Sequence, residues 1–463
     1  MEINRIDGSF RDPSGFLFKH DQVLYRQVNK RYADEYTLLM SSGLYESLIK
    51  SRLLVAHEEV NDIQPAEPKD AFKIIRPQRV NFISYPYEWS FSQLKDAALA
   101  TLSIQKRAMK YGMSLKDASA YNIQFHEGKA TLIDTLSFEK YTEGTPWVAY
   151  KQFCQHFLAP LALMAKADIR LSQLLRIHID GIPLDLASGL LPFSTRLNFG
   201  LLTHIHLHAR AQQQYADKQV ETSTAQKGGM SKQALQGLVE SLESAVKALT
   251  WKPVGTEWGD YYNFTNYSDS SFEQKKEIIG KWVEQVKPRS VWDMGANTGF
   301  FTRIASEQGI PSVAFDIDPA AVEKNYRQVK SSKEKNILPL IQDLTNPSPS
   351  IGWNNRERDA LSGRAPADMI FALAIIHHLA ISNNVPLVDI SGFFHGLVGK
   401  WLVIEFVPKS DSQVKKLLAS RLDIFDEYTA EGFERYFIEK FCLKEKSQIL
   451  GTERFLYLLE TRP

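Results

Sequence analysis

Short apolar runs alternate with amphipathic stretches throughout the part of the chain that follows Trp251. The apolar runs have the length of strands and lie at 290–292, 312–315, 337–341, 369–374 and 401–406. The stretches between them have helical spacing and lie at 301–307, 320–329, 387–397 and 412–421. Because strands that alternate with helices pair in parallel, this pattern predicts an α/β fold with a doubly wound, Rossmann-like sheet.

The end of the chain follows a different pattern. Two strand-like runs, 441–449 and 454–460, flank Gly451 with no helix between them. Two runs joined by a short glycine-containing connection are typical of an antiparallel hairpin. The parallel sheet is therefore expected to end in a hairpin.

A polar tract at 216–230 contains two adjacent glycines and almost no large apolar residue, which is typical of a linker. A chain of 463 residues is also too long for one ordinary domain. We therefore expect an α+β domain at 1–215 that recognises the acceptor, a linker at 216–230, and a second domain at 231–463. This second domain would begin with an amphipathic helix at 231–249.

Composition and charge exclude several classes of protein. An apolar fraction of 44% with 24% charged residues is the balance of a soluble globular protein, and the net charge of +1 gives no bulk attraction to nucleic acid or to a membrane. The N-terminus has no apolar signal region, and only two cysteines occur. The sequence therefore predicts a cytoplasmic protein with no nucleic-acid or membrane partner, and leaves its oligomeric state open.

The strand-like run at 290–292 leads into the sequence VWDMGANTGFF, residues 291–301. Glycine at 295 and 299 permits a sharp turn and close approach to a ligand, and Asn297 tolerates left-handed backbone. The helix that follows offers free N–H groups to a carboxylate, and Asp293 can face an ammonium group. This arrangement predicts a cofactor site, and a nucleotide-binding turn of another kind is the alternative.

Acidic residues follow the next two strands. Asp316 lies 23 residues after Asp293, at the position from which a carboxylate accepts hydrogen bonds from ribose hydroxyls. Asp318 is the alternative for this role. Asp343 and Leu344 follow the third strand, where a turn or a helix cap would also explain the acid.

Residues 291–301 resemble the first motif of class I S-adenosylmethionine methyltransferases, and DMIFALAIIHHLA, residues 368–380, resembles the fourth. The resemblance implies S-adenosylmethionine as cofactor, with Asp343 at the adenine amino group, the Leu344 N–H beside it and Ala372 among the cofactor-binding residues. The Asn-Pro-Pro-Tyr signature of enzymes that methylate amino groups of DNA and protein is absent. A dehydrogenase matches these later strands less well.

Candidate catalytic residues follow the fourth and fifth strands. A hydroxyl or protonated nitrogen acceptor needs a general base, and histidine titrates near neutral pH. His377, His378 and Glu405 are candidates for this base. The alternative is that they pack or bond to the backbone. No metal site is predicted.

The first half of the chain carries Asp117, Asn122 and Asp134 at a spacing that resembles the catalytic core of protein-kinase-like folds. The resemblance implies a site for Mg-ATP. Lys116 stands where His-Arg is usual, and Thr-Leu-Ser follows Asp134 in place of Phe-Gly. The alternative is that these residues form turns and caps in a recognition domain.

Segments along nearly the whole chain resemble host-specific nodulation methyltransferases, a two-part bacterial family. They are SYPYEWSFSQLKDAALATL, LKDASAYNIQF, IDTLSFE and IEFVPKSDSQV. This resemblance implies a small-molecule or glycan acceptor. Three hypotheses follow: a methyltransferase with an acceptor-recognising first domain, a bifunctional enzyme that also phosphorylates, and a cofactor-binding regulator without catalysis.

Overall fold

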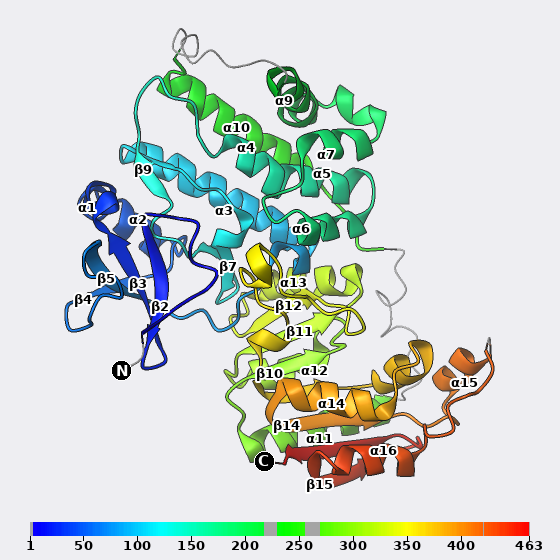
Figure 1. Ribbon diagram of the computed structural model, residues 1–463. Coiled ribbons are helices and arrows are strands. Elements are labelled where there is room, and N and C mark those ends of the chain that lie inside the picture. The colour runs from blue at the N-terminus through cyan, green and yellow to red at the C-terminus, as the bar shows by residue number, and fades with distance from the viewer. Residues whose placement is uncertain (1–2, 217–228, 255–268, 420, 463) are drawn as a thin grey trace. The chain divides into compact units, whose positions relative to one another are not determined.

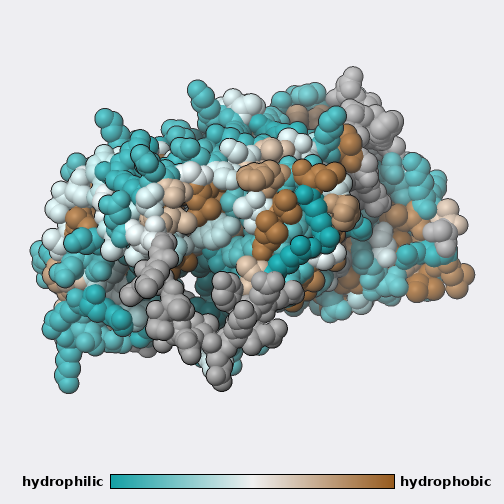
Figure 2. Space-filling view, turned by 90° about the horizontal axis from the view of Figure 1, so that it is seen from above, coloured by the Kyte–Doolittle hydropathy of each residue, from teal (hydrophilic) through white to brown (hydrophobic). Residues whose placement is uncertain are grey.

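The computed structural model describes residues 3–216, 229–254, 269–419 and 421–462, and divides into two compact units. The first unit comprises Met1–Lys252 and Ile351–Arg358, and the second comprises Pro253–Ser350 and Asp359–Pro463. Most of the linker expected at 216–230 lies outside the described residues. None of the described helices is long and apolar enough to cross a membrane. On the face shown in Figure 2, hydrophilic residues predominate and apolar residues form separate groups.

The helix expected at 231–249 is α10 (Lys232–Ala248), and it belongs to the first unit rather than to the second domain, where the sequence pattern had placed it. Figure 1 shows it beside α3 (Phe91–Lys110), with which it packs. Lys95 of α3 donates to the carbonyls of Lys247 and Leu249 at 2.8 and 2.7 Å. Helical periodicity identifies the buried face of a helix but not the partner that covers it, which explains the difference.

The first unit has an antiparallel sheet followed by a helical region, so the expected α+β class is confirmed. The sheet has the order β1-β2-β3-β5-β4, and two smaller strand pairs, β6-β9 and β7-β8, follow it. The strands are β1 (Ile3–Arg5), β2 (Gly15–His20), β3 (Val23–Asn29), β4 (His57–Val60), β5 (Ala71–Pro77), β6 (Met113–Leu115), β7 (Ile123–His126), β8 (Lys129–Leu132) and β9 (Phe138–Lys140). The helices besides α3 and α10 are α1 (Ala33–Ser41), α2 (Leu44–Lys50), α4 (Tyr150–Phe153), α5 (Ala159–Lys166), α6 (Leu174–Ile177), α7 (Leu184–Leu190), α8 (Phe199–Leu201) and α9 (His208–Ala216).

The second unit contains a seven-stranded sheet of order β12-β11-β10-β13-β14-β16-β15. All neighbouring strands are parallel except β16, which runs antiparallel to both β14 and β15. The predicted Rossmann-like sheet with a terminal hairpin is therefore confirmed. The strands are β10 (Val291–Met294), β11 (Ser312–Asp316), β12 (Ile337–Ile341), β13 (Ala367–Ala372), β14 (Val398–Phe406), β15 (Phe441–Gln448) and β16 (Phe455–Thr461).

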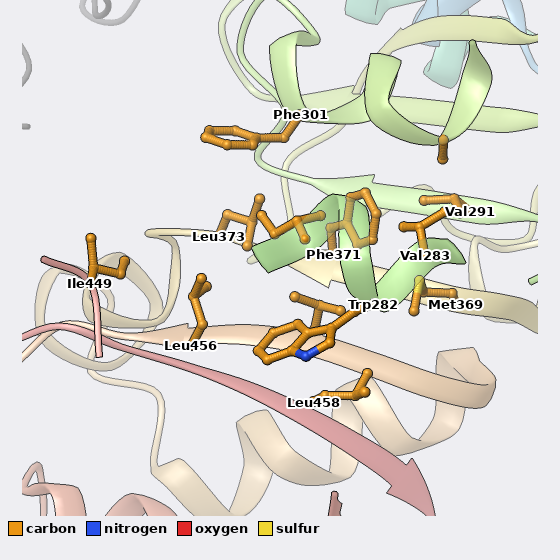
Figure 3. Packing of buried hydrophobic residues seen from close by; sticks show 13 residues of the cluster. Trp282, Val283, Val291, Phe301, Met369, Phe371, Leu373, Ile449, Leu456 and Leu458 are labelled. Atoms are coloured by element: carbon orange, nitrogen blue, oxygen red, sulfur yellow. The ribbon is translucent and has the colours of Figure 1, made fainter. Parts of the chain in front are cut away.

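Helices of the second unit pack against this sheet and bury its apolar side chains. They are α11 (Asp269–Val286), α12 (Phe300–Ser306), α13 (Pro319–Ser332), α14 (Leu387–Leu397) and α16 (Ala430–Ile438). The short helix α15 (Ser412–Leu418) contacts the segment 378–382 instead. In Figure 3, Trp282 and Val283 of α11 lie beside Val291, Met369 and Phe371 of the central strands. This core fixes the strand ends from which the candidate site is built.

Candidate cofactor site

A cavity of about 370 Å³ lies at the carboxyl ends of β10, β11, β12 and β13. This is the edge at which an open α/β sheet binds its ligands. Most of its wall comes from the segments that directly follow these strands, and α15 contributes one residue. The cavity is lined by Gly295, Asn297, Asp316, Ile317, Gln342, Asp343, Leu344, Thr345, Leu373, Ala374, Ile375, His378, Leu379, Ser382, Asn383 and Leu417.

The turn after β10 has the left-handed backbone that its glycines and asparagine suggest. The φ angles are +92° at Gly295, +49° at Asn297 and +78° at Gly299. A Cβ at residue 299 would lie 2.4 Å from the side-chain amide nitrogen of Asn325, so a larger residue there would force the Asn325 side chain to move and would strain the left-handed backbone. Gly295 and Asn297 line the cavity, whereas Gly299 caps α12 below it.

The Asp316 carboxylate lies at the end of β11 and faces the cavity. Its Oδ2 accepts the backbone N–H of Asn297 at 2.7 Å, and its Oδ1 accepts that of Asp318 at 2.8 Å. Burial raises the pKa of this carboxyl to about 6, and the two hydrogen bonds partly offset this effect because they favour the ionised form. The group is therefore largely ionised at neutral pH and is held in one orientation.

Asp318, the alternative to Asp316, is the N-cap residue of α13. Its Oδ1 accepts the N–H groups of Ala320 and Ala321 at 2.8 and 3.2 Å, which caps α13. It is not among the residues that line the cavity. Of the two acids, the geometry brings only Asp316 to the site.

Asp343 and Leu344 also line the cavity, at the carboxyl end of β12. Asp343 Oδ1 accepts the backbone N–H and the hydroxyl of Thr345 at 2.8 and 2.7 Å. The turn predicted as an alternative for this acid is therefore present, and the residue lines the cavity as well.

Asp293 and Ala372 lie beneath the cavity rather than in its wall. Asp293 is buried, and its Oδ2 accepts the hydroxyl of Thr302 at 2.6 Å. Burial raises its pKa to about 7. The structure thus directs Asp293 towards α12, so the expected contact with a cofactor ammonium group is not supported. Ala372 is the buried last residue of β13, and the next residues, Leu373 and Ala374, line the cavity instead.

The two adjacent histidines differ in position. His378 lines the cavity, and burial lowers its pKa to about 4. His377 is buried behind it, with ring centroids 4.1 Å apart, and burial holds its pKa well below the usual value. Among the described residues, no group forms a hydrogen bond with His377 Nδ1. Both imidazoles are neutral at neutral pH, and only His378 is placed to contact a ligand.

Glu405 does not reach the cavity. It is fully buried at the end of β14, where its two oxygens pair with Lys275 Nζ at 2.6 Å and Arg454 Nη1 at 3.3 Å. Arg454 also pairs with Asp411 at 2.8 Å. A carboxylate that neutralises two buried cations is not available to accept a proton, so the structure corrects the expectation of a catalytic Glu405.

The candidate nucleotide residues of the first unit contact the protein itself. Arg26 Nη1 of β3 lies 2.5 Å from Asp134 Oδ1, and both side chains are mostly buried. Asp117 Oδ1 accepts the Ser119 N–H and the Gln152 amide at 2.9 and 2.8 Å. Asn122 donates to Ser137 Oγ at 3.4 Å. No group of three acidic, histidine or cysteine residues in the described part of the chain is arranged to hold a metal ion.

Several residues of the site had no signal in the sequence. Lys275 and Arg454 are single cations on amphipathic segments, where solvent exposure is the usual outcome. Ser382, Asn383 and Leu417 reach the cavity only because η11 (His378–Ser382) and α15 fold against each other. The left-handed backbone of Ala374 (φ +51°) is likewise set by the fold, because alanine has no intrinsic preference for it.

Comparison with known proteins identifies one relative over nearly the full length. The chain is 36% identical over 470 residues to the nodulation protein NoeA of Rhizobium meliloti strain 1021, which covers 98% of this chain and 96% of that protein. No protein-family model matches the chain.

Solved structures similar to part of the chain include S-adenosylmethionine-dependent methyltransferases. Magnesium protoporphyrin IX methyltransferase ChlM of Synechocystis PCC 6803, with bound SAH, has a TM-score of 0.32 at 15% identity and covers 44% of this chain and 93% of its own. N-methyltransferase NodS of Bradyrhizobium japonicum WM9 has a TM-score of 0.30 at 12% identity, and the match covers 42% of this chain and 100% of NodS. The bifunctional kinase-methyltransferase WbdD has a TM-score of 0.29 at 13% identity, and the match covers 42% of this chain and 40% of WbdD. Likenesses at these TM-scores carry no inference about activity.

Proposed function

The chain belongs to the family of the nodulation protein NoeA, and we propose that its second unit is an S-adenosylmethionine-dependent methyltransferase. The observation that carries this proposal is the Asp316 carboxylate, which two backbone N–H groups orient towards a cavity beside the Gly295 turn. A buried, fixed carboxylate at this edge of a parallel sheet suits a ligand with adjacent hydroxyls, such as ribose.

The residues of the cavity fit the parts of this cofactor. Asp316 would accept hydrogen bonds from the ribose hydroxyls, and Asp343 would accept one from the adenine amino group. The N–H of Leu344 would donate to the adenine ring. At residue 295 a Cβ would lie 3.3 Å from Ile375, so the glycine keeps the cavity open where the backbone approaches a ligand most closely.

The cofactor supplies a methyl group on a sulfonium that is already activated. The chain's own residues then have to exclude water and position the acceptor. Leu373, Ile375, Leu379 and Leu417 give the cavity an apolar wall suited to excluding water. His378 is the imidazole in the cavity wall that could accept a proton from an acceptor hydroxyl or ammonium group, and the low pKa that burial gives it makes it a weak base. His377 packs behind it and supports its orientation.

A small molecule or a glycan in the cytoplasm is the acceptor that we propose, and the first unit would select it. This assignment rests on His378, a proton acceptor in the cavity wall, and on the absence from the sequence of the Asn-Pro-Pro-Tyr signature of enzymes that methylate amino groups of DNA and protein. The ion pair between Arg26 and Asp134 gives the bifunctional hypothesis no support, because it occupies an acid that Mg-ATP binding would need.

Calorimetric titration of the full chain with S-adenosylmethionine tests the proposal. Binding by the wild type and its loss in Gly295→Arg are expected, because the arginine side chain would fill the cavity. Gly237→Arg is the matched control, since Gly237 lies on the exposed face of α10 with no atom near its Cβ position. Absence of binding by the wild type would refute the proposal, and heat from Mg-ATP would support a bifunctional enzyme.

Formation of S-adenosylhomocysteine with cell extract as acceptor source separates an enzyme from a regulator. His378→Gln is expected to lower turnover by about 10²- to 10⁴-fold without changing cofactor affinity. His377→Gln should have a smaller effect, because its ring lies behind that of His378. If both variants lost the same turnover, or neither lost any, the assigned proton acceptor would be wrong.

A further inference from the structure

Four strongly or partly exposed apolar side chains are concentrated in residues 190–199 of the first unit, which we call the apolar turn. Phe193, Leu197 and Phe199 are 72%, 84% and 76% exposed, and Leu190 is 44% exposed. Single exposed apolar residues are ordinary on a protein surface, but a cluster of this size marks a surface that contacts another body.

Hydrogen bonds beneath the apolar turn hold its backbone in place. The Thr195 hydroxyl donates to the Pro192 carbonyl at 2.6 Å and lies 2.9 Å from His206 Nε2. Ser188 Oγ lies 2.7 Å from the other nitrogen of the same ring. Thr195 and His206 are both buried. These contacts hold the backbone that carries the exposed side chains.

A second anchor lies at the end of the apolar turn. Asn198 Oδ1 accepts the Leu201 N–H at 3.0 Å, which caps α8. A Cβ at Gly200 would lie 2.8 Å from the Cβ of Ala245 on α10, so the chain packs directly on this helix. The backbone at the end of the apolar turn is therefore held against α10.

The one charged residue within the apolar turn is Arg196, and the exposed Asp185 lies five residues before the turn begins. Residues 186–216 contain no aspartate or glutamate and two arginines, Arg196 and Arg210. Both are exposed, and the Arg196 guanidinium lies 5.2 Å from the centre of the Phe193 ring. By contrast, the exposed Leu422 and Ile424 of the second unit have Asp423 between them and Asp426 beside them.

We propose that the apolar turn inserts into the headgroup region of an anionic lipid bilayer. Exposed phenylalanine and leucine side chains partition into the boundary between headgroups and acyl chains, and exposed arginine pairs with lipid phosphate. The sequence predicted no membrane partner because the net charge of the whole chain is +1. A net charge for the whole chain gives no information about the charge of one local segment. The inference stands independently of the methyltransferase proposal.

Flotation of the full chain with vesicles tests this inference. The wild type is expected to float with vesicles of phosphatidylcholine and phosphatidylglycerol, and less with phosphatidylcholine alone. The triple variant Phe193→Ser, Leu197→Ser, Phe199→Ser should float at least about tenfold less, because it loses the inserted apolar area. Arg196→Glu should reduce flotation with the anionic vesicles only.

The paired variant Leu422→Ser, Ile424→Ser is the control, since it removes similarly exposed apolar side chains elsewhere and should float as the wild type does. Thermal unfolding of the triple variant should match the wild type, because the three side chains are exposed. A wild type that stays in solution, or a triple variant that floats undiminished, would overturn the inference. A dimer of the wild type that the triple variant dissociates, without flotation of either, would assign the surface to a second copy instead.

Discussion

Lys275 Nζ lies 2.6 Å from Glu405 Oε2, and both side chains are almost completely buried beneath the candidate cofactor site. Arg454 takes the other carboxylate oxygen and extends the network to Asp411. A buried charge without a partner is costly, so loss of one member of this pair should destabilise the second unit.

Removing the charge at residue 405 should therefore damage stability. Glu405→Gln leaves the buried Lys275 without its anion and leaves Arg454 with Asp411 alone, and should lower the free energy of unfolding by about 3–5 kcal/mol in urea titrations. Glu460→Gln removes one partner of the partly exposed Lys444 pair and should cost less than about 1 kcal/mol. Similar losses in the two variants would contradict a structural role for the buried pair.

Substitution of Asp316 should change cofactor binding, whereas substitution of Asp318 should change stability. Asp316→Asn should weaken the binding of S-adenosylmethionine by about 1.5–3 kcal/mol in calorimetry, because the variant loses a carboxylate that accepts hydrogen bonds from the ligand. Asp318→Ala should leave the affinity unchanged and lower the free energy of unfolding by about 1 kcal/mol, the usual effect of removing an N-cap. The reverse pattern would transfer the ribose contact to Asp318.

The affinity for S-adenosylmethionine should fall with acid near pH 6. Burial raises the pKa of the Asp316 carboxyl to about 6 in the free protein, and only the ionised form accepts hydrogen bonds from both ribose hydroxyls. The affinity should be constant well above pH 6 and decrease below it, by up to about tenfold per pH unit. Dissociation constants measured across this range should lose the dependence in Asp316→Asn, and a variant with an unchanged profile would exclude Asp316 as its source.

His156 should make the first unit less stable in acid. It is buried, and burial lowers its pKa to about 4 from the ordinary value of 6.5. Because the unfolded chain binds the proton more readily, the contribution of neutral His156 to the free energy of unfolding is fully present above pH 6.5 and is lost as the pH falls towards 4. This one group contributes a slope of up to about 1.4 kcal/mol per pH unit. Urea titrations of His156→Gln should show a shallower slope in that window, and a slope equal to that of the wild type would argue against His156.

Local rules of the backbone and of side-chain patterning determined much of this protein from its sequence. Apolar runs predicted β11 and β12 within one residue of their ends, because a buried parallel strand requires a continuous apolar segment. Glycine and asparagine predicted the left-handed turn after β10. The carboxyl ends of parallel strands meet at one edge, so Asp316, Asp343 and His378 could be placed at a common site before any coordinates were known.

Only the tertiary structure decided the direction and the partner of each side chain. Asp293 lies one residue before the end of β10 and Asp316 at the end of β11, yet Asp293 turns towards Thr302. Glu405 is neutralised by cations from distant segments. Helix α10 packs against α3 although it precedes the second unit in sequence, and the apolar side chains of Phe193, Leu197 and Phe199 are exposed. These outcomes depend on contacts between residues far apart in the chain, and a single sequence read along its length carries no record of such contacts.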